Sequence, residues 1–294
     1  MSRRVRTPLI FLIPAFLLLC VFVLYPTANT IYLSFFHHGD FVGFDNYMEV
    51  FSRKEFLNTE RSLLEGPPYG ALVHNFIWIL IHLPLSIFFG LLLAVLLREV
   101  KEGAIIKSII YLGMVIPMVV GGILLRFLYD EHAGVVNALL RFVGLGGIAR
   151  SWTRFPDTAL ISLILGTVWI WTGFCMIVYS AGLESIPTDL YEAARVDGAS
   201  RWRTFWRITV PMLRPTTIVV VTMTLLWELK IFDIVYVATF GGPRGATNVM
   251  AFLMYLDAFC TFPAKFGTAS AIAIILTVMT FGFAAYMVSR MVKS

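Results

Sequence analysis

Three charged side chains and a tryptophan lie close together in an apolar stretch of the last third of the chain, at Trp227, Glu228, Lys230 and Asp233. If this stretch crosses a membrane, three charges facing lipid cost roughly 8–10 kcal/mol, at about 2.5–3.5 kcal/mol each near the bilayer centre. The twelve Leu, Ile, Val and Phe of residues 216–237 return only about 4–7 kcal/mol, at about 0.3–0.6 kcal/mol each. We therefore expect the four side chains to face a protein interior or a water-filled path.

Two hypotheses account for these side chains. In the first, a structural ion pair locks this helix against residues 157–181 or against a partner protein. Lys230 and Asp233 are three residues apart and can also pair with each other on one face of their helix. In the second, a carboxylate accepts hydrogen bonds from the hydroxyl groups of a sugar, while Trp227 packs on the apolar face of that sugar. On a helix Glu228 lies ~100° from Trp227, so that one straight face cannot hold all four side chains. The residues alone leave both hypotheses open.

The motifs of common catalytic and metal sites are missing from the sequence. There is no Gly-x-x-x-x-Gly-Lys-Ser/Thr loop to cradle ATP phosphates, no His-Glu-x-x-His and no Gly-x-Ser-x-Gly. His74 and His82 lie more than two helical turns apart, and we expect them to pack between helices or at an interface. Cys20, Cys175 and Cys260 have no metal-ligating or redox spacing. We therefore expect no catalytic residue, no metal and no cofactor in this chain, and no enzyme activity.

The elements that must position these residues are transmembrane helices. The chain has 294 residues, of which 59% are hydrophobic and 14% charged, whereas a soluble domain has about a quarter charged residues. A bilayer core needs about 20 apolar residues of helix, and six stretches meet this need, at about 8–36, 71–97, 104–127, 157–181, 215–237 and 266–289. The sequence predicts an all-α polytopic membrane protein, with residues 1–294 forming a single transmembrane domain.

The basic residues predict how these six helices are oriented. The net charge is +5, but the Lys and Arg flank apolar stretches, which indicates membrane topology and no nucleic-acid partner. If both termini are cytoplasmic, the inner segments hold thirteen basic residues and the outer segments nine. Arg3, Arg4 and Arg6 precede an apolar run that is too long for a signal peptide, which favours a retained first helix. We therefore expect both termini in the cytoplasm.

The large inner loop, residues 182–214, is typical of two short helices with a glycine between them. Pro187 suits a helix start, and Asp189 followed three residues later by Glu192 has the spacing of a capping box. Gly198 can adopt the left-handed conformation that ends a helix, and Ser200 can cap the next one.

Each of the two short helices has a face that another surface could cover. The second helix places Trp202, Phe205, Trp206 and Thr209 on one side and directs Arg201, Arg203 and Arg207 elsewhere. The first carries Ala193 and Ala194, which leave a small flat surface over which another protein could close. An ordinary amphipathic loop on the membrane surface is the alternative interpretation.

The same loop resembles a known family. Glu192-Ala193-Ala194, three residues, Gly198, nine residues and then Ile-x-Val-Pro is similar to the Glu-Ala-Ala loop of permease subunits in binding-protein-dependent ABC importers. The one departure is Val210, where leucine is more usual. The resemblance implies the fold of a type I importer permease, with this loop as the coupling helix that inserts into a cleft of a cytoplasmic ATPase. By position, the docking residues would be Glu192, Ala193, Ala194, Asp197 and Gly198.

Three further stretches resemble the carbohydrate branch of that family, namely residues 41–47, 134–140 and 232–243. They look like the maltose-permease F-type subunit and its relatives for glycerol phosphate, lactose and trehalose. The resemblance implies a subunit in the cytoplasmic membrane of a prokaryotic cell that imports a mono- or oligosaccharide by alternating access. It also implies three kinds of partner: a second, different permease, two ATPase subunits that bind ATP and Mg, and an extracytoplasmic sugar-binding protein.

The family resemblance also suggests a sugar path. Carried over by position, the sugar contacts would be Thr167, Ile170, Trp171, Phe174, Trp227, Glu228 and Asp233. Several of these residues differ from the maltose subunit, so maltose itself is not implied, and in some importers the site lies in the partner permease. Two alternatives stay open: the same architecture moving a glycerol phosphate ester, for which Lys230 is the one uncompensated basic group, and a secondary transporter that works without nucleotide.

Overall fold

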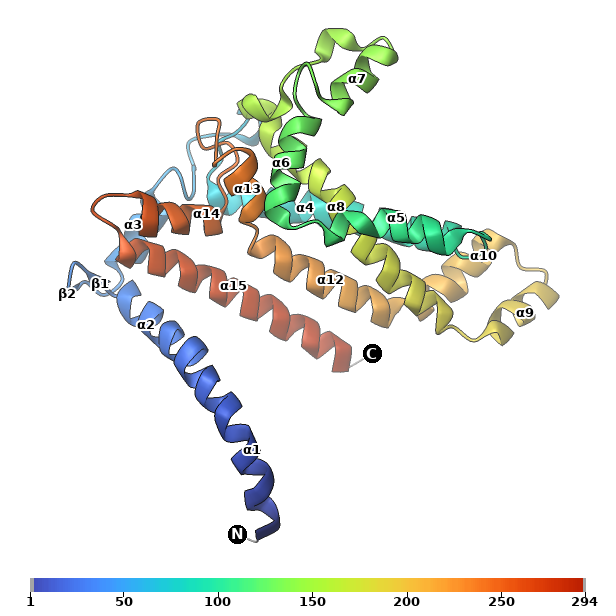
Figure 1. The fold of residues 1–294 in the computed structure, drawn as a ribbon, viewed down its shortest axis with the longest axis horizontal. Coiled ribbons are helices and arrows are strands. Elements are labelled where there is room, and N and C mark those ends of the chain that lie inside the picture. Colours follow the sequence, from blue (N-terminus) through green and yellow to red (C-terminus); the bar gives the residue numbers. More distant parts are fainter. Residues whose placement is uncertain (1–2, 293–294) are drawn as a thin grey trace.

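The computed structural model describes residues 3–292, and the regular secondary structure in this part of the chain is helical apart from one two-stranded hairpin (Figure 1). The longer helices are α1 (Arg3–Leu19), α2 (Tyr25–Ser34), α4 (Ala71–Leu96), α5 (Gly103–Val115), α6 (Met118–Leu128), α8 (Pro156–Glu184), α12 (Arg214–Leu229) and α15 (Phe266–Val292). The shorter helices are α3 (Asp45–Ser52), α7 (Val135–Phe142), α9 (Thr188–Val196), α10 (Arg201–Thr204), α11 (Val210–Met212), α13 (Asp233–Ala238) and α14 (Met250–Tyr255). The hairpin pairs β1 (Phe36–His37) with β2 (Asp40–Phe41) in antiparallel register.

Single π-helical and 3₁₀ turns join several of these helices. The π-helical turns are Cys20–Leu24, Phe205–Thr209 and Leu256–Cys260, and the 3₁₀ turns are Leu63–Glu65, Gly146–Ile148 and Trp152–Arg154. Within residues 3–292, four helices are long and apolar enough to cross a membrane: Phe11–Ser34, Ala71–Leu96, Pro156–Glu184 and Phe266–Arg290. Two bent pairs, α5 with α6 and α10–α11 with α12, raise the number of candidate spans to as many as six.

The predicted helix over residues 104–127 is broken rather than straight. Helix α5 ends at Val115, α6 begins at Met118, and their axes are bent by 100°. The cause is Pro117, because its ring disfavours the helical conformation for the preceding residue. Ile116 is accordingly extended, with φ −67° and ψ 126°. The predicted helix over residues 104–127 is therefore interrupted at Pro117, and α6 turns away from the direction of α5 (Figure 1).

The predicted helix over residues 215–237 also ends early. Helix α12 stops at Leu229, and α13 starts at Asp233 after an irregular turn. The side-chain amide of Asn75 stabilises this break, since it donates to the carbonyl oxygens of Glu228 at 3.2 Å and Leu229 at 3.5 Å. Its carbonyl oxygen accepts from the backbone N–H of Met250 at 2.9 Å. One buried side chain thus fastens the end of α12 to α4 and to the start of α14.

Helix α8 lies at the centre of the bundle and packs against α4, α5 and α12. Small residues bring the helix backbones close, as is common for helices within membranes. A Cβ atom added to Gly90 of α4 would lie only 2.3 Å from the Cβ atom of Cys175 on α8. One added to Gly173 of α8 would lie 3.0 Å from the backbone of Ile110 on α5. The close approach of α8 to two neighbours therefore depends on glycine.

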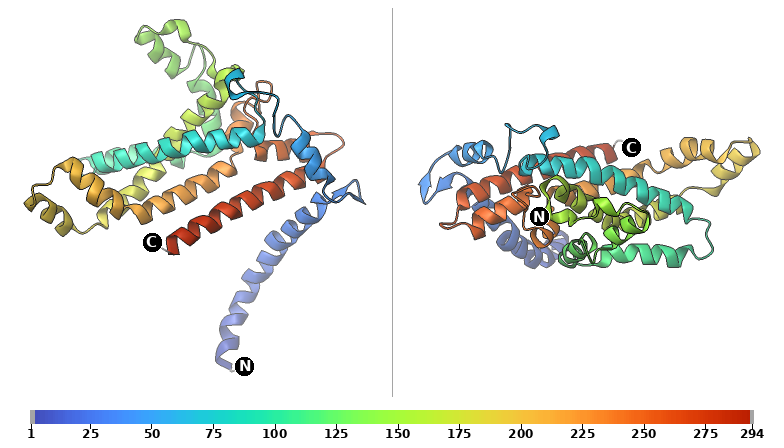
Figure 2. Two further views of the ribbon diagram at one scale, coloured as in Figure 1. Left: turned by 180° about the vertical axis from the view of Figure 1, so that it is seen from behind. Right: turned by 90° about the horizontal axis from the view of Figure 1, so that it is seen from above.

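The short elements gather at the two ends of the bundle. Helices α9 and α10 form one end, while the hairpin, α3 and α14 lie at the opposite end (Figure 1). Helix α2 packs against α15, but α1 diverges from the other helices (Figures 1 and 2). The end with the hairpin is therefore built from segments that are far apart in the sequence, whereas α9 and α10 follow each other in the chain.

A buried ion pair ties the segment after α3 to the end of the bundle that contains the hairpin. The guanidinium group of Arg53 donates to both carboxylate oxygens of Asp257, at 2.6 and 2.9 Å. Thr268 of α15 donates to the same carboxylate at 2.7 Å. The hydrogen bond from Arg53 to Asp257 raises the pKa of Arg53 above its ordinary value. Two parallel hydrogen bonds of this kind fix the relative orientation of the two side chains in addition to pairing their charges.

The α4–α8 contact predicts a difference between two glycines. Gly90→Ala places a methyl group against Cys175 and is expected to lower the free energy of unfolding by about 1–3 kcal/mol, as overpacking does. Gly282→Ala in α15 is the control, because an added Cβ atom there meets nothing within 4 Å. Thermal unfolding of the purified chain in detergent measures both. Equal melting temperatures for the two variants would contradict this packing.

Candidate functional site

The buried carboxylate of Glu228 pairs with a histidine of another helix. Its Oε1 atom lies 2.6 Å from Nδ1 of His82 on α4, and both side chains have 0% exposure. Because a carboxylate only accepts hydrogen bonds, Nδ1 is the donor when Glu228 is ionised. Nε2 of His82 lies 3.4 Å from the hydroxyl of Ser86. The second carboxylate oxygen, Oε2, has no hydrogen-bond partner in the part of the chain that the structure describes.

Two stacked tryptophans lie beside this pair. The rings of Trp171 on α8 and Trp227 on α12 are 4.6 Å apart and inclined by 18°. Trp227 is also 5.5 Å from the ring of His82. Trp171 donates its indole N–H to the hydroxyl of Thr224 at 2.7 Å. Carboxylate, imidazole and indole groups from α4, α8 and α12 therefore meet at one place, which we call the intramembrane cluster (His82, Ser86, Trp171, Trp227 and Glu228).

Five of the seven residues predicted for a sugar path meet at this cluster. Trp171, Trp227 and Glu228 belong to it, and the ring of Phe174 lies 5.3 Å from that of Trp171. The backbone of Thr167 forms a hydrogen bond with His82, while the hydroxyl of Thr167 donates to backbone carbonyl oxygens of its own helix, at 2.8 and 3.0 Å. Ile170 is buried in the apolar core.

The structure separates Asp233 from the other six. It lies beyond the break at the end of α12 and is exposed in the first turn of α13. Within residues 3–292, neither Asp233 nor Lys230 forms an ion pair, so that the proposed pairing of these two charges was wrong. The physical reason is the break itself, because residues three apart face each other only on a continuous helix.

The role of His82 does not follow from ligand spacing within one helix. Its partner, Glu228, is 146 residues away in the sequence. A usable signal was present, since a carboxylate in an apolar span requires a donor and His82 lies in another such span. His74 follows the packing prediction, with Nδ1 2.7 Å from the carbonyl oxygen of Asn248 and Nε2 accepting from the backbone of Tyr69.

The loop over residues 182–214 folds into two helical segments around a glycine. Gly198 has φ +71° and thus the predicted left-handed conformation. The hydroxyl of Ser200 accepts from the backbone N–H of Arg203 at 3.3 Å, which confirms the predicted cap. The capping box of Asp189 and Glu192 was wrong, because α9 begins after Pro187, which lacks a side-chain acceptor.

The residues predicted to dock an ATPase lie on or next to α9. Glu192, Ala193, Asp197 and Gly198 are exposed, whereas Ala194 is only 8% exposed and faces the rest of the chain. Four of the five positions are therefore accessible to a partner.

A hydrogen bond connects α9 to the segment that leads into α12. The hydroxyl groups of Tyr191 and Thr209 are 3.2 Å apart. Thr209 ends the π-helical turn that continues through α11 into α12. In the same segment the rings of Trp202, Phe205 and Trp206 contact one another. A displacement of α9 can therefore reach α12, which carries Glu228.

The buried pair predicts a large effect on stability. His82→Leu leaves a carboxylate buried without a donor and is expected to cost about 3–5 kcal/mol of unfolding free energy. The double variant His82→Leu/Glu228→Leu should recover most of this loss, because it removes both polar groups. His132→Leu, at an exposed position, is the control. Chemical denaturation in detergent measures all three, and an additive double variant would contradict the pairing.

Known proteins are similar to this chain over nearly its whole length. A probable ABC transporter permease of Pyrococcus horikoshii is 53% identical over 290 residues, which cover 98% of this chain and 99% of that protein. An alpha-glucoside transport system permease of Rhizobium meliloti is 34% identical, over 95% of this chain and 82% of that protein.

The fold has a counterpart among solved structures. A chain of a bacterial ABC transporter involved in alginate import superimposes with a TM-score of 0.81 at 24% identity, covering 99% of this chain and 96% of that chain. At this identity the likeness concerns the fold alone. A family model described as the binding-protein-dependent transport system inner membrane component matches residues 86–294. This chain therefore belongs to that family, the membrane-embedded permeases of ABC transporters.

Proposed function

We propose that this chain is a permease subunit of an ATP-driven importer for a sugar, either a mono- or an oligosaccharide. The observation that carries the proposal is the exposed α9 segment, joined by the Tyr191–Thr209 hydrogen bond to the helix that holds the intramembrane cluster. The 34% identity to an alpha-glucoside permease supports the choice of sugar. The chain lacks the Gly-x-x-x-x-Gly-Lys-Ser/Thr loop that cradles ATP phosphates. We therefore assign ATP and Mg to the partner ATPases.

The chemistry of the intramembrane cluster suits a carbohydrate. Sugars offer hydroxyl donors and flat apolar C–H faces, and the cluster offers a carboxylate acceptor in Glu228 beside the indole rings of Trp171 and Trp227. The unpartnered Oε2 atom of Glu228 leaves one acceptor for a substrate hydroxyl. A carboxylate at this position disfavours an anionic solute such as a glycerol phosphate ester.

The cluster is closed in this structure. Glu228 and His82 are both fully buried, so a sugar reaches them only when α4 and α12 separate. We infer that the two hypotheses for Glu228, a structural pair and a sugar contact, describe two states of one element. In the closed state His82 satisfies the carboxylate, and in the open state substrate hydroxyl groups replace it. Alternating access requires two such arrangements of comparable free energy.

The partners follow from the proposed function. We propose that two ATPase subunits engage α9 in the cytoplasm, where both termini also lie, and that a second, different permease completes the path. An extracytoplasmic sugar-binding protein would deliver the substrate at the end formed by the hairpin, α3 and α14. The location is the cytoplasmic membrane of a prokaryotic cell. In the span Phe11–Ser34, the most apolar stretch has no buried residue. Its exposed apolar side chains therefore require lipid or a partner around them.

A substitution at the turn after α9 tests the coupling. Gly198→Asp introduces a side chain at a left-handed position and adds a negative charge where the ATPase would dock. We therefore expect uptake of a labelled disaccharide to fall at least tenfold, while the complex still assembles. Gly144→Asp is the matched control, because Gly144 also has a positive φ, +82°, and open space around it. Normal uptake and ATPase stimulation in Gly198→Asp would refute the assignment of α9.

A second substitution tests the sugar contact. Glu228→Gln keeps the shape and one acceptor but replaces the carboxyl group by an amide, and we expect the KM for sugar uptake to rise about tenfold, the equivalent of about 1.4 kcal/mol. Assembly with the partner permease should be unchanged. If instead the complex fails to assemble while uptake per assembled complex is normal, Glu228 has only a structural role. Uptake that continues without the ATPase would identify a secondary transporter.

A further inference from the structure

A cavity with polar walls lies beside the loop over residues 182–214, and none of the residues of the intramembrane cluster lines it. It has a volume of about 730 Å³ and is bounded by the end of α4, the end of α8, α9, α10 and the π-helical turn. Its polar wall carries the guanidinium groups of Arg98, Arg195 and Arg201. Its apolar wall consists of Val95, Leu96, Leu183 and Phe205. The cavity therefore has one cationic and one apolar side.

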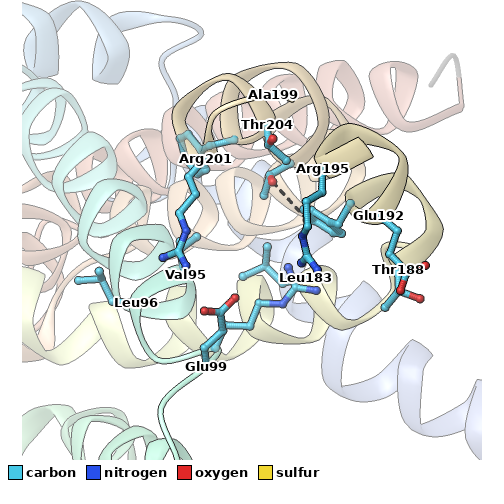
Figure 3. Close-up of a pocket in the computed structure, with 14 residues that line it drawn as sticks. Val95, Leu96, Glu99, Leu183, Thr188, Glu192, Arg195, Ala199, Arg201 and Thr204 are labelled. Atoms are coloured by element: carbon cyan, nitrogen blue, oxygen red, sulfur yellow. Dashed lines mark hydrogen bonds between the residues drawn. The ribbon is translucent and has the colours of Figure 1, made fainter. Parts of the chain in front are cut away.

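The three guanidinium groups form no ion pair with any carboxylate among the described residues. In residues 3–292, none of them has a hydrogen-bond or ion-pair partner, although Glu99 and Glu192 line the same cavity. Arg98 instead lies over the ring of Tyr191, 4.8 Å from its centroid. Figure 3 shows Arg195 and Arg201 pointing into the cavity, while the carboxylate of Glu192 lies near Thr188 at its edge.

We propose that this cavity binds the phosphate group of an anionic phospholipid. Arginine matches phosphate oxygens through two parallel N–H donors, and three arginines line this one cavity, from the segment after α4, from α9 and from α10. The cavity volume of about 730 Å³ is within the range of pockets that hold drug-sized ligands. The cavity is therefore larger than a phosphate headgroup. The cavity thus has the charge and the size for the headgroup.

The apolar wall favours a lipid over a free phosphate. Leu96 is the last residue of α4 and is 59% exposed, and the exposed Leu92 and Phe89 precede it on the same helix. An acyl chain lying along this surface brings its headgroup to the arginines at the membrane interface, where each basic residue contributes about fivefold to binding of anionic lipid. A soluble phosphate would use the arginines and leave the apolar wall uncovered.

Because of where the cavity lies, a bound lipid would affect the coupling between α9 and the rest of the bundle. Arg98 follows α4, whereas Arg195 belongs to α9 and Arg201 to α10. One phosphate held by all three would fix α9 relative to α4. This consequence rests on the proposed function, since α9 is the element that would receive the ATPase. The binding site itself does not depend on that assignment.

Lipid retention by the purified full chain tests the site without any transport measurement. After exchange into detergent with phosphatidylglycerol and phosphatidylcholine, native mass spectrometry should show preferential retention of phosphatidylglycerol. Arg98→Gln/Arg195→Gln/Arg201→Gln should reduce this retention roughly a hundredfold, at about fivefold for each arginine. Arg203→Gln/Arg207→Gln is the matched control, because these arginines do not line the cavity, and it should retain phosphatidylglycerol as the native chain does.

A further variant tests the electrostatic part of the proposal. Glu99→Gln removes a negative charge from the cavity wall and should raise retention of phosphatidylglycerol, whereas unchanged or lower retention would contradict a phosphate group held at this wall. Equal retention by the triple variant and the control would overturn the proposal. So would displacement of the lipid by millimolar inorganic phosphate, which identifies a soluble-anion site, or its loss on assembly with the ATPase, which identifies a protein occupant.

Discussion

A carboxylate buried among apolar helices is the constraint on which the centre of this molecule depends. Glu228 lies in α12 at 0% exposure, where no water is at hand to solvate it. Such a group is tolerable only with a nearby donor, and His82 supplies one at 2.6 Å. The pair fixes the distance between α4 and α12. Among the residues that the structure describes, it also leaves one carboxylate oxygen of Glu228 without a hydrogen-bond partner, and that oxygen is available to a ligand or in another state of the site.

The broken helices of this fold follow from the same constraint. A helix end within the membrane exposes backbone carbonyl groups that need donors. Asn75 supplies donors to two carbonyl oxygens at the end of α12 and accepts from the start of α14. A proline enforces the other break, between α5 and α6. Both breaks adjoin the packed centre around α8, where buried side chains can satisfy the freed backbone groups.

Close packing at glycines and the loop over residues 182–214 determine how α12 can move relative to α4. Helix α8 approaches α4 and α5 closely through Gly90 and Gly173, so these helices behave as a tightly packed body. Helix α12 is connected differently, since the segment that leads into it is bent by 64° and is hydrogen-bonded to α9. A force applied to α9 therefore acts on α12 relative to α4. That is the movement by which His82 and Glu228 would separate.

The sequence by itself determined the membrane character of this chain, the positions of most helices and the family. Each of these depends on local properties, namely runs of apolar residues, flanking arginines and the Glu-Ala-Ala motif followed by Gly198. The turn at Gly198 and the cap at Ser200 were likewise predictable, because both involve residues close together in the chain.

Only the tertiary structure decided what the charged residues do. The sequence placed Glu228, Lys230 and Asp233 on one continuous helix, but the helix ends between them because Asn75, from another span, stabilises the break. The partner of Glu228 could not be identified from spacing, since His82 is 146 residues away. The burial of Ala194 beside the exposed Ala193 likewise depends on how α9 packs. Helix formation is governed by neighbours along the chain, whereas the pairing of buried polar groups is governed by neighbours in space.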